Sequence, residues 1–246
     1  DGLQRRDARF FNSCMMATAL GAAVSDALED GRVVSGVGGQ YNFVAMGHAL
    51  PGARSVLMFR ALREARGRTE SNVRWSYGHA TIPRHLRDIY VNEYGIADLR
   101  HASDEDCAIA MAGITDVRWQ QPLLDTARSA RKLRTDFTAL PRWRRNTPQR
   151  LGEALATFRS DGTLPDYPLG SDFTPVEQRI VRALAWLQSN TATPMAKLRT
   201  VVQALVRAPT GDDNEALQRM ELHAPAGATA WLERRLLRLA LARTSG

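Results

Sequence analysis

Residues 34–47 form a glycine-dense segment, VSGVGGQYNFVAMG, whose second half has an apolar, helical character. Gly36, Gly38 and Gly39 have no Cβ, so the backbone there can adopt positive φ and present bare N–H groups to a ligand at close range. A loop of this kind before a helix suits an anion or a polarised carbonyl. Because glycine clusters also form simple tight turns, the loop alone does not decide between a binding site and a turn.

A second motif follows further along the chain. It consists of Pro83-Arg84-His85 and the octapeptide EYGIADLR at residues 93–100. Together with SGVGGQYNFV at residues 35–44, and in this order and spacing, these motifs resemble the C-terminal half of the acetyl-CoA hydrolase/transferase family. The resemblance covers residues 8–125, and the octapeptide is its most specific part.

The resemblance implies a reaction in which CoA moves between carboxylic acids, or is released to water, through a glutamyl-CoA thioester on the enzyme. Each step builds negative charge on a carbonyl oxygen, which fixed backbone donors stabilise. The loop is therefore expected to contact the thioester and CoA, with Gly38 and Gly39 acting through the backbone and Ser35 and Gln40 through their side chains. CoA and acyl-CoA are expected as substrates, and no tightly bound cofactor is expected.

Two further residues are expected to contact CoA. Asn12 matches an asparagine that the family commonly has in the strand before the loop, although a satisfied buried amide is the alternative. Met16 stands where an acidic residue usually follows, so whatever that acid does is absent here. Arg63, with Arg60 and Arg66 nearby, is suited to the CoA phosphates, although arginine is common throughout this chain.

The nucleophilic glutamate of the family is not identified with Glu93, despite its place in the most specific motif. The resemblance places the nucleophile in a separate, earlier segment, which would lie upstream of Asp1. Glu93 is expected to make a buried ion pair or hydrogen bonds with Arg84, Arg87 or Arg100, because a buried carboxylate must be paired. The chain is therefore expected to be a fragment, with the nucleophile in the missing N-terminal half.

The composition is that of an ordinary globular protein, with 246 residues, 44% hydrophobic and 24% charged. No apolar run approaches the ~20 residues of a membrane span, and the sequence does not open on a charged-then-apolar pattern, so a cytoplasmic protein without a membrane partner is expected. Two cysteines, Cys14 and Cys107, cannot form a disulfide framework. The histidines lack the paired spacing of a helical metal site, so no metal is expected.

The first half of the chain predicts alternating strands and helices. Apolar runs at residues 9–16, 55–59 and 88–91 are typical of buried strands. Helices are predicted over residues 41–48 and from Ser103, which precedes three acidic residues. This alternation predicts a layered α/β domain, and the resemblance specifies a CoA-transferase-like (NagB/RpiA-type) domain over residues 1–131.

Residues 132–170 are expected to form a basic linker with a short helix, and residues 171–246 a small all-helical extension. The run RWRR at residues 142–145 could stack on nucleic acid, but no nucleic-acid-binding motif accompanies it, so nucleic acid is not expected as a partner. Three helix starts share a threonine followed by a proline, which suits a capping hydroxyl before the first helical position. They are Thr147-Pro148, Thr174-Pro175 and Thr193-Pro194.

These features favour the C-terminal part of a bacterial CoA-transferase or acyl-CoA hydrolase, with acyl-CoA and a carboxylate as substrates and the missing N-terminal half as partner. A homodimer is a further possible assembly, and the sequence leaves the oligomeric state open. A non-catalytic CoA-binding or regulatory module and an interaction protein that docks a partner through its helical tail are the competing functions. Hydrolysis and transfer share one thioester intermediate, so the sequence does not separate them.

Overall fold

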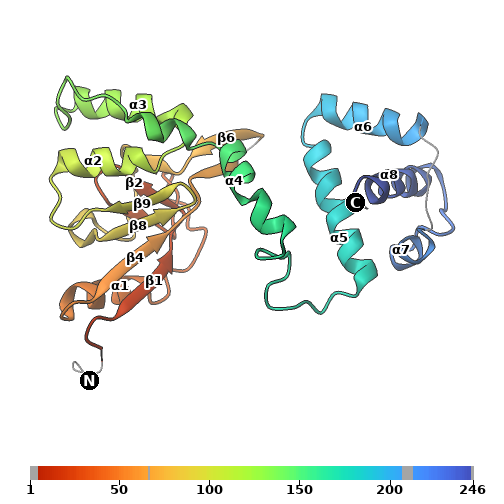
Figure 1. Ribbon diagram of the computed structural model, residues 1–246, viewed down its shortest axis with the longest axis horizontal. Helices are drawn as coiled ribbons and strands as arrows, with labels where there is room; N and C mark the ends of the chain where they lie inside the picture. The colour runs from red at the N-terminus through yellow and green to blue at the C-terminus, as the bar shows by residue number, and fades with distance from the viewer. Residues whose placement is uncertain (1–4, 66, 207–212, 245–246) are drawn as a thin grey trace. The chain divides into compact units, whose positions relative to one another are not determined.

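The chain forms two compact units, Asp1–Thr163 and Leu164–Gly246. The structure, a computed structural model, describes residues 5–65, 67–206 and 213–244 (Figure 1). Within these residues the first unit mixes strands with helices, and the regular elements of the second are all helices. This confirms the predicted fold class, a layered α/β domain followed by a helical extension. The domain bounds at residues 131 and 170 remain predictions.

A four-stranded sheet with the order β1-β4-β8-β9 is the centre of the first unit. Its first three strands are parallel, and the fourth turns back antiparallel to the third. The predicted strands at residues 55–59 and 88–91 are confirmed, each with its bounds shifted by one residue or less. The four strands are β1 (Arg9–Ser13), β4 (Arg54–Met58), β8 (Ile89–Asn92) and β9 (Gly95–Asp98).

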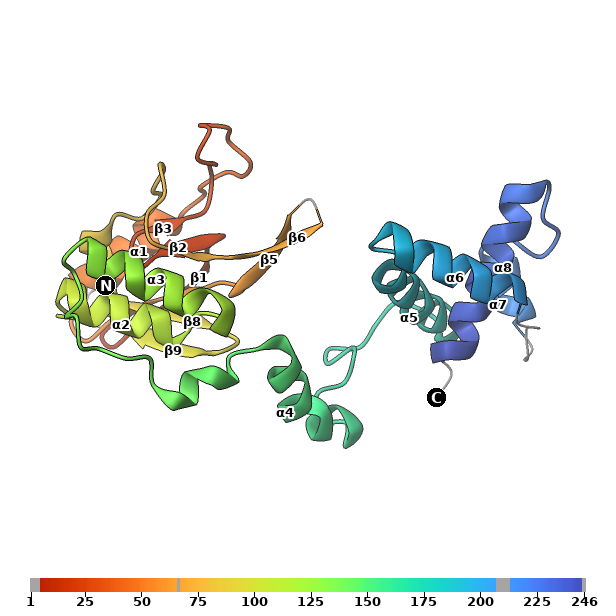
Figure 2. The ribbon, with the colours of Figure 1, turned by 90° about the horizontal axis from the view of Figure 1, so that it is seen from above.

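The chain continues from the carboxyl end of β1 into one smaller sheet and from the carboxyl end of β4 into another. One has the order β3-β2-β7, and the other is the β5–β6 hairpin, which extends beyond the central sheet (Figure 2). Their strands are β2 (Met16–Thr18), β3 (Ala23–Val24), β5 (Leu62–Ala65), β6 (Arg68–Ser71) and β7 (Val73–Arg74).

The expectation of one buried strand over residues 9–16 is wrong for its first half. β1 is an edge strand of the central sheet, and Phe11 within it is 62% exposed. Met16 in β2, by contrast, is fully buried. An apolar run predicts a strand well, but it does not reveal which strand lies at the edge.

Helices cover the central sheet of the first unit (Figure 1). α1 (Gln40–Ala49) packs against β1 and β4, α2 (Asp104–Gly113) packs against β9, and α3 (Val117–Ser129) packs against α2. The predicted start of α2 is confirmed, since Ser103 and Asp106 form a reciprocal capping box. The remaining helical elements are η1 (Arg84–Leu86), η2 (Pro141–Arg145) and α4 (Pro148–Ser160).

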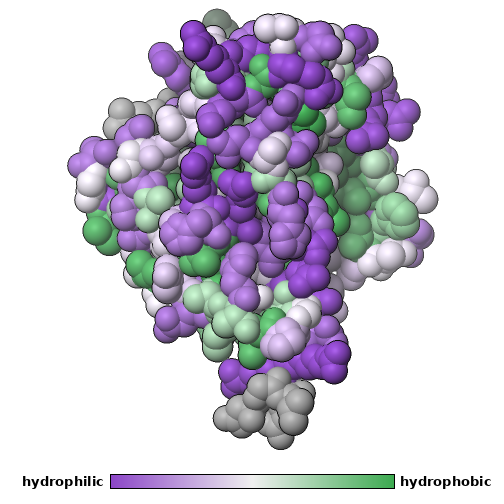
Figure 3. All heavy atoms as spheres, turned by 90° about the vertical axis from the view of Figure 1, so that its left-hand side faces the viewer, coloured by the Kyte–Doolittle hydropathy of each residue, from purple (hydrophilic) through white to green (hydrophobic). Residues whose placement is uncertain are grey.

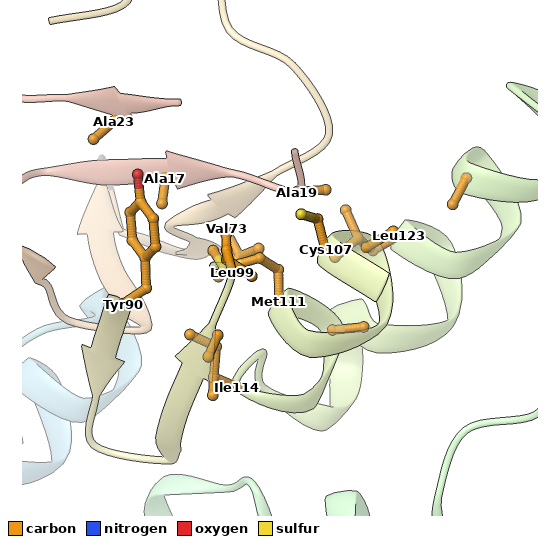
Figure 4. Packing of buried hydrophobic residues seen from close by; sticks show 14 of the residues in the cluster. Ala17, Ala19, Ala23, Val73, Tyr90, Leu99, Cys107, Met111, Ile114 and Leu123 are labelled. Atoms are coloured by element: carbon orange, nitrogen blue, oxygen red, sulfur yellow. The ribbon is translucent and has the colours of Figure 1, made fainter. Parts of the chain in front are cut away.

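The core of the first unit lies between the sheets and the helices α2 and α3 (Figure 4). Tyr90 of β8 points toward Ala17 and Ala23 in Figure 4, and its hydroxyl donates to the carbonyl oxygen of Gly21 at 3.0 Å. Burial raises the pKa of Tyr90 well above its usual value, so the hydroxyl stays a donor. This core includes Leu57 of β4, Tyr90 of β8 and Ala97 of β9, so it supports these three strands of the central sheet.

The first part of the predicted linker packs onto this core. Leu133, Phe137 and Trp143 are buried, with the two aromatic rings 6.1 Å apart. Asn146 donates from Nδ2 to two carbonyl oxygens at the end of α2, at 2.8 and 3.0 Å. The arginines beside Trp143 remain exposed, so the RWRR run is a turn that buries its indole and leaves its charges in solvent.

The second unit is a small helical bundle in which α5 and α6 pack against α8 and α7 packs against α5. All three predicted threonine caps are confirmed: the hydroxyls of Thr147, Thr174 and Thr193 accept from the N–H three residues further on. No helix among the described residues is long and apolar enough to cross a membrane. The helices are α5 (Pro175–Asn190), α6 (Pro194–Val206), α7 (Asn214–Arg219) and α8 (Ala228–Thr244).

Candidate functional site

The carboxyl ends of the three parallel strands border a cleft of about 1240 Å³. It is lined by residues 13–15 at the end of β1, by residues 58–60 at the end of β4, by residues 62–64 of β5 and by residues 91–93 at the end of β8, together with Asn72 and Pro148. Open α/β sheets commonly bind ligands beyond the carboxyl ends of their strands, where the connecting loops converge. This cleft is therefore the candidate site.

The glycine loop lies beside this cleft because Gln40 ties it to β1. The Gln40 side chain is buried, and its Nε2 donates to the carbonyl oxygen of Ser13 at 3.0 Å. Ser13 itself lines the cleft. Gln40 thus holds the loop in place with one amide N–H, and its predicted contact with a ligand remains a prediction.

Backbone N–H groups are open to a ligand where the loop enters α1. Gly38 has φ +57°, a left-handed value that glycine adopts without strain, and Gly39 directly precedes the helix. Among the described residues no side chain caps α1, and its first turn contains no acidic residue. The first N–H groups of a helix carry a partial positive charge, so this end can receive an anion or a developing oxyanion.

Ser35 lies at the far side of the loop and is exposed. Its hydroxyl reaches only the neighbouring carbonyl oxygen of Gly36 among the described residues, at 3.3 Å. The segment between β3 and α1 protrudes from the first unit in Figure 2. Ser35 is free to contact a ligand, and that role also remains a prediction.

Asn12 carries a donor without a partner. Its Nδ2 is buried and makes no hydrogen bond to the described residues. Since a buried amide donor left unpaired costs free energy, a water or a ligand group is expected to satisfy it. The alternative was a buried amide whose hydrogen bonds the protein itself supplies. Asn12 Nδ2 does not fit that alternative.

Arg63 lines the cleft, but its guanidinium already pairs with Glu70. Nε and Nη2 lie 3.1 and 2.7 Å from Glu70 Oε2, and Arg74 lies 2.7 Å from the same oxygen. The hydrogen bond from Arg63 is the main cause that lowers the pKa of Glu70. Two arginines against one carboxylate give this cluster one net positive charge, while Glu64 and Glu93 add two carboxylates to the cleft lining. Arg60 also lines the cleft, and Arg66 lies outside the described residues.

Met16, which stands in place of the expected acid, contacts Arg63. Its Sδ lies 3.5 Å from Nη1 of Arg63. A carboxylate at this position would compete with Glu70 for Arg63, whereas the thioether leaves the Arg63–Glu70 pair intact.

Glu93 does not make the ion pair expected from the sequence. It is exposed at the cleft, and its Oε2 accepts from the N–H of Ala61 at 2.9 Å. The three arginines proposed as its partners lie at the other end of β8, where they pair with different acids. The strand separates them because Arg87 precedes β8 and Glu93 follows it.

Cys14 is the thiol that lines the cleft. Burial raises its pKa to about 12, so the side chain stays a neutral thiol at physiological pH. A thiolate nucleophile is therefore not available at this position. Among the described residues, no group of three or more histidine, cysteine, aspartate or glutamate side chains could hold a metal ion.

Asp26 fixes the start of the glycine loop, although no motif in the sequence marks it. Its backbone carbonyl oxygen accepts from the N–H groups of Val34 and Ser35, at 2.7 and 3.2 Å. Its carboxylate accepts from the hydroxyl of Thr81 and lies 2.9 Å from Nε2 of His79. The Thr81 hydrogen bond and then the His79 contact lower the pKa of Asp26.

These contacts connect the two motifs of the sequence. His79 and Thr81 immediately precede Pro83-Arg84-His85, so Asp26 joins that segment to the glycine loop. The partners lie more than 50 residues apart in the chain, and no local pattern marks such a pairing.

Comparison with known proteins found one family and several solved structures. The profile described as acetyl-CoA hydrolase/transferase C-terminal domain matches residues 2–127. RipA from Yersinia pestis is 23% identical with a TM-score of 0.47, and the match covers 52% of this chain and 29% of RipA. The 4-hydroxybutyrate CoA-transferase from Porphyromonas gingivalis is 24% identical with a TM-score of 0.40, covering 51% and 27%.

The chain thus spans less than a third of the length of either solved protein. A comparison with curated proteins found no match.

Proposed function

Because the chain belongs to the acetyl-CoA hydrolase/transferase family through residues 2–127, we propose that it forms one wall of the active site of a CoA-transferase or acyl-CoA hydrolase. Its substrates are an acyl-CoA and either a carboxylate or water. The observation that carries this proposal is the uncapped start of α1, preceded by Gly38 and Gly39, beside the cleft at the carboxyl ends of the parallel strands.

The proposed reaction begins when a glutamate carboxylate attacks the carbonyl carbon of the acyl-CoA. The C–S bond breaks, CoA leaves as a thiolate, and an acyl-glutamyl anhydride remains. The thiolate then attacks the glutamyl carbonyl, which releases the carboxylate of the first substrate and leaves a glutamyl-CoA thioester. A second carboxylate can reverse these steps to take up CoA, or water can release it.

This chain would contribute the donors that stabilise each oxyanion. The loop N–H groups and the first turn of α1 are held by the fold before the substrate arrives, which is what makes such donors effective. Removing one oxyanion donor typically costs about 10²–10³ in rate. Arg63 and Arg74 outnumber Glu70, and the guanidinium of Arg63 in the cleft lining is suited to bind a CoA phosphate.

We place the nucleophilic glutamate outside this chain, in an N-terminal half of the same polypeptide. Apolar side chains around the loop support a covering protein surface, because they are exposed to a degree that is unusual for such residues. They are Phe11, Val33, Val34, Val37, Tyr41 and Phe43, between 39% and 69% exposed. A bacterial, cytoplasmic setting is proposed on the family resemblance alone.

The alternative is a CoA-binding module without catalysis. Glu64 and Glu93 line the cleft, and neither forms an ion pair with an arginine among the described residues. A catalytic role for this chain alone would require one of these carboxylates as nucleophile, and the binding module would require no nucleophile at all.

The experiment uses the longer natural polypeptide with acetyl-CoA, with and without succinate as acceptor, followed by borohydride trapping and mass spectrometry. We expect one reduced glutamate in a segment that precedes Asp1, and none at Glu93. Modification of Glu93 would move the nucleophile into this chain. Acetyl-CoA binding without any modified glutamate would favour the non-catalytic module.

A further inference from the structure

A second cavity lies at the opposite ends of the strands from the CoA cleft, beside the amino ends of β4 and β8. Its volume is about 650 Å³, and it is bordered by the end of α1, by η1 and by the start of α2. Figure 3 looks onto the side of the first unit where α2 begins, and hydrophilic side chains cover much of this face. The proposed CoA-binding function does not use this cavity.

Basic side chains outnumber acidic ones around the cavity. Four arginines and three histidines line it, against the two carboxylates of Asp88 and Asp104. The arginines come from β4, from the turn before β8 and from the turn after β9, so they approach the cavity from separate segments. They are Arg54, Arg84, Arg87 and Arg100.

The two carboxylates leave these arginines incompletely paired. Lys132 lies closest to Asp104, at 2.8 Å, whereas Arg84 and Arg87 stand 3.6 and 3.7 Å from it, beyond hydrogen-bond distance. Arg54 donates from Nη1 to the carbonyl oxygen of the preceding residue and makes no ion pair within the described part of the chain.

Two of the histidines are also without hydrogen-bond partners. His85 and His101 line the cavity and form no hydrogen bond with the residues that the structure describes. Asp88 is buried and accepts from the N–H of Ser55 at 2.6 Å, and Arg100 stands 3.8 Å from it while binding Asp98. The unused donors around the cavity therefore belong to Arg54, Arg84, His85 and His101.

We propose that this cavity binds a small phosphorylated anion, at a site separate from the CoA cleft. A phosphoryl group presents three strong acceptor oxygens, and the planar guanidinium fork matches its geometry. Donors that reach the cavity from several segments suit a polyvalent oxyanion better than a single carboxylate. The volume lies within the range of small-molecule sites, ~300–1,000 Å³, which accommodates a pyrophosphate or nucleotide-sized ligand.

The test is isothermal titration of the chain with inorganic pyrophosphate at low ionic strength, where charge interactions are least screened. We expect saturable binding of one pyrophosphate per chain. Arg84→Gln and Arg54→Gln should each weaken it about tenfold, the usual scale for a charge-assisted hydrogen bond. Arg84→Lys keeps the charge without the fork and should fall between the wild type and Arg84→Gln.

Arg159→Gln is the matched control. Arg159 is exposed on α4, so this substitution removes the same charge at a position away from the cavity. It should leave pyrophosphate affinity within about twofold of the wild type. Equal weakening by Arg159→Gln and Arg84→Gln would show a diffuse charge effect and overturn the proposal, as would a wild-type chain that binds no pyrophosphate. Thermal unfolding of each variant shows that the fold is intact.

Acetyl-CoA is titrated into the same variants to separate this site from the proposed CoA site. Unchanged acetyl-CoA binding together with lost pyrophosphate binding is the result we expect. Weakening of both ligands by Arg54→Gln would mean one shared site and would contradict the proposal. The pyrophosphate result does not depend on whether the chain binds CoA.

Discussion

The carboxyl ends and the amino ends of the strands in the central sheet, here called the carboxyl edge and the amino edge, carry different kinds of donor. At the carboxyl edge, the open donors are backbone N–H groups of the glycine loop and of the first turn of α1, and Arg63 beside them is paired with Glu70. At the amino edge, the open donors are arginine and histidine side chains around a smaller cavity. Backbone donors are positioned by the fold, whereas side-chain donors act mainly through charge.

This difference predicts how each edge responds to mutation. A site built on backbone geometry is sensitive to changes of φ and ψ and to the anchors of the loop. A site built on charged side chains is sensitive to charge and to salt. Substitutions that separate geometry from charge therefore distinguish the two edges.

The largest expected effect on stability comes from a substitution in the core that supports the central sheet. Tyr90→Ala deletes a fully buried ring of the common core and should lower the free energy of unfolding by about 3–5 kcal/mol, as for other large aromatic residues in cores. Tyr90→Phe removes only the hydrogen bond to Gly21 and should cost about 1 kcal/mol. Urea unfolding measures both. A loss below 1 kcal/mol for Tyr90→Ala would show that this core does not support the sheet.

Asp26→Asn should affect the carboxyl edge alone. It weakens the contacts with His79 and Thr81 that hold the start of the glycine loop, so we expect acetyl-CoA binding to fall about tenfold, the scale of one charge-assisted hydrogen bond. Pyrophosphate binding at the amino edge should not change. Calorimetry with both ligands gives the comparison, and equal loss of both would contradict a local anchoring role.

The same aspartate predicts a pH dependence. Its pKa is lowered in the folded chain, chiefly by the Thr81 hydrogen bond, so its contribution to stability is present above its unfolded pKa of about 3.9. That contribution is lost as the pH falls from there through the lower folded value. In acid titrations followed by circular dichroism, Asp26→Asn should lose less stability than the wild type over this range. Parallel curves for the two proteins would exclude the linkage.

Arg63→Gln should have the smallest effect of these substitutions. Its charge is partly neutralised by Glu70, and Arg74 still neutralises that carboxylate after the change. We expect acetyl-CoA binding to weaken only about two- to fivefold, a fraction of a full charge-assisted contact. Arg68→Gln, in the adjacent strand β6, is the matched control and should have no effect. A loss above fiftyfold would make Arg63 a main CoA contact.

Local features of the fold were predictable because their signals lie within a few residues of one another. The caps at Ser103 and Thr174 depend on side chains three positions apart, and both form as predicted. The glycine loop before α1 was recognised for the same reason, since its glycines and the helix adjoin in the chain.

Features that depend on distant residues could not be predicted. Asp26 meets His79 and Thr81 only after the strands have assembled, and the cavity at the amino edge combines arginines from three separate segments. The expected pairing of Glu93 with arginines was wrong because β8 places them at opposite ends, a fact of topology that charge composition does not contain. Trp143 is buried although its neighbours are basic, since burial depends on the direction of each side chain.

The measurement that tests the central claim most directly compares two glycines with the same backbone constraint. Gly38 and Gly162 both have positive φ, +57° and +78°, and at both positions an added Cβ would meet nothing within 4 Å. Gly38→Val and Gly162→Val therefore impose similar strain, but only the first changes the loop beside the cleft.

Acetyl-CoA is titrated into the two variants and the wild-type chain by calorimetry. We predict that Gly38→Val weakens binding at least about tenfold, because the loop N–H groups move, and that Gly162→Val binds like the wild type. Equal affinity of all three proteins for acetyl-CoA would contradict the assignment of the glycine loop as the CoA-binding element.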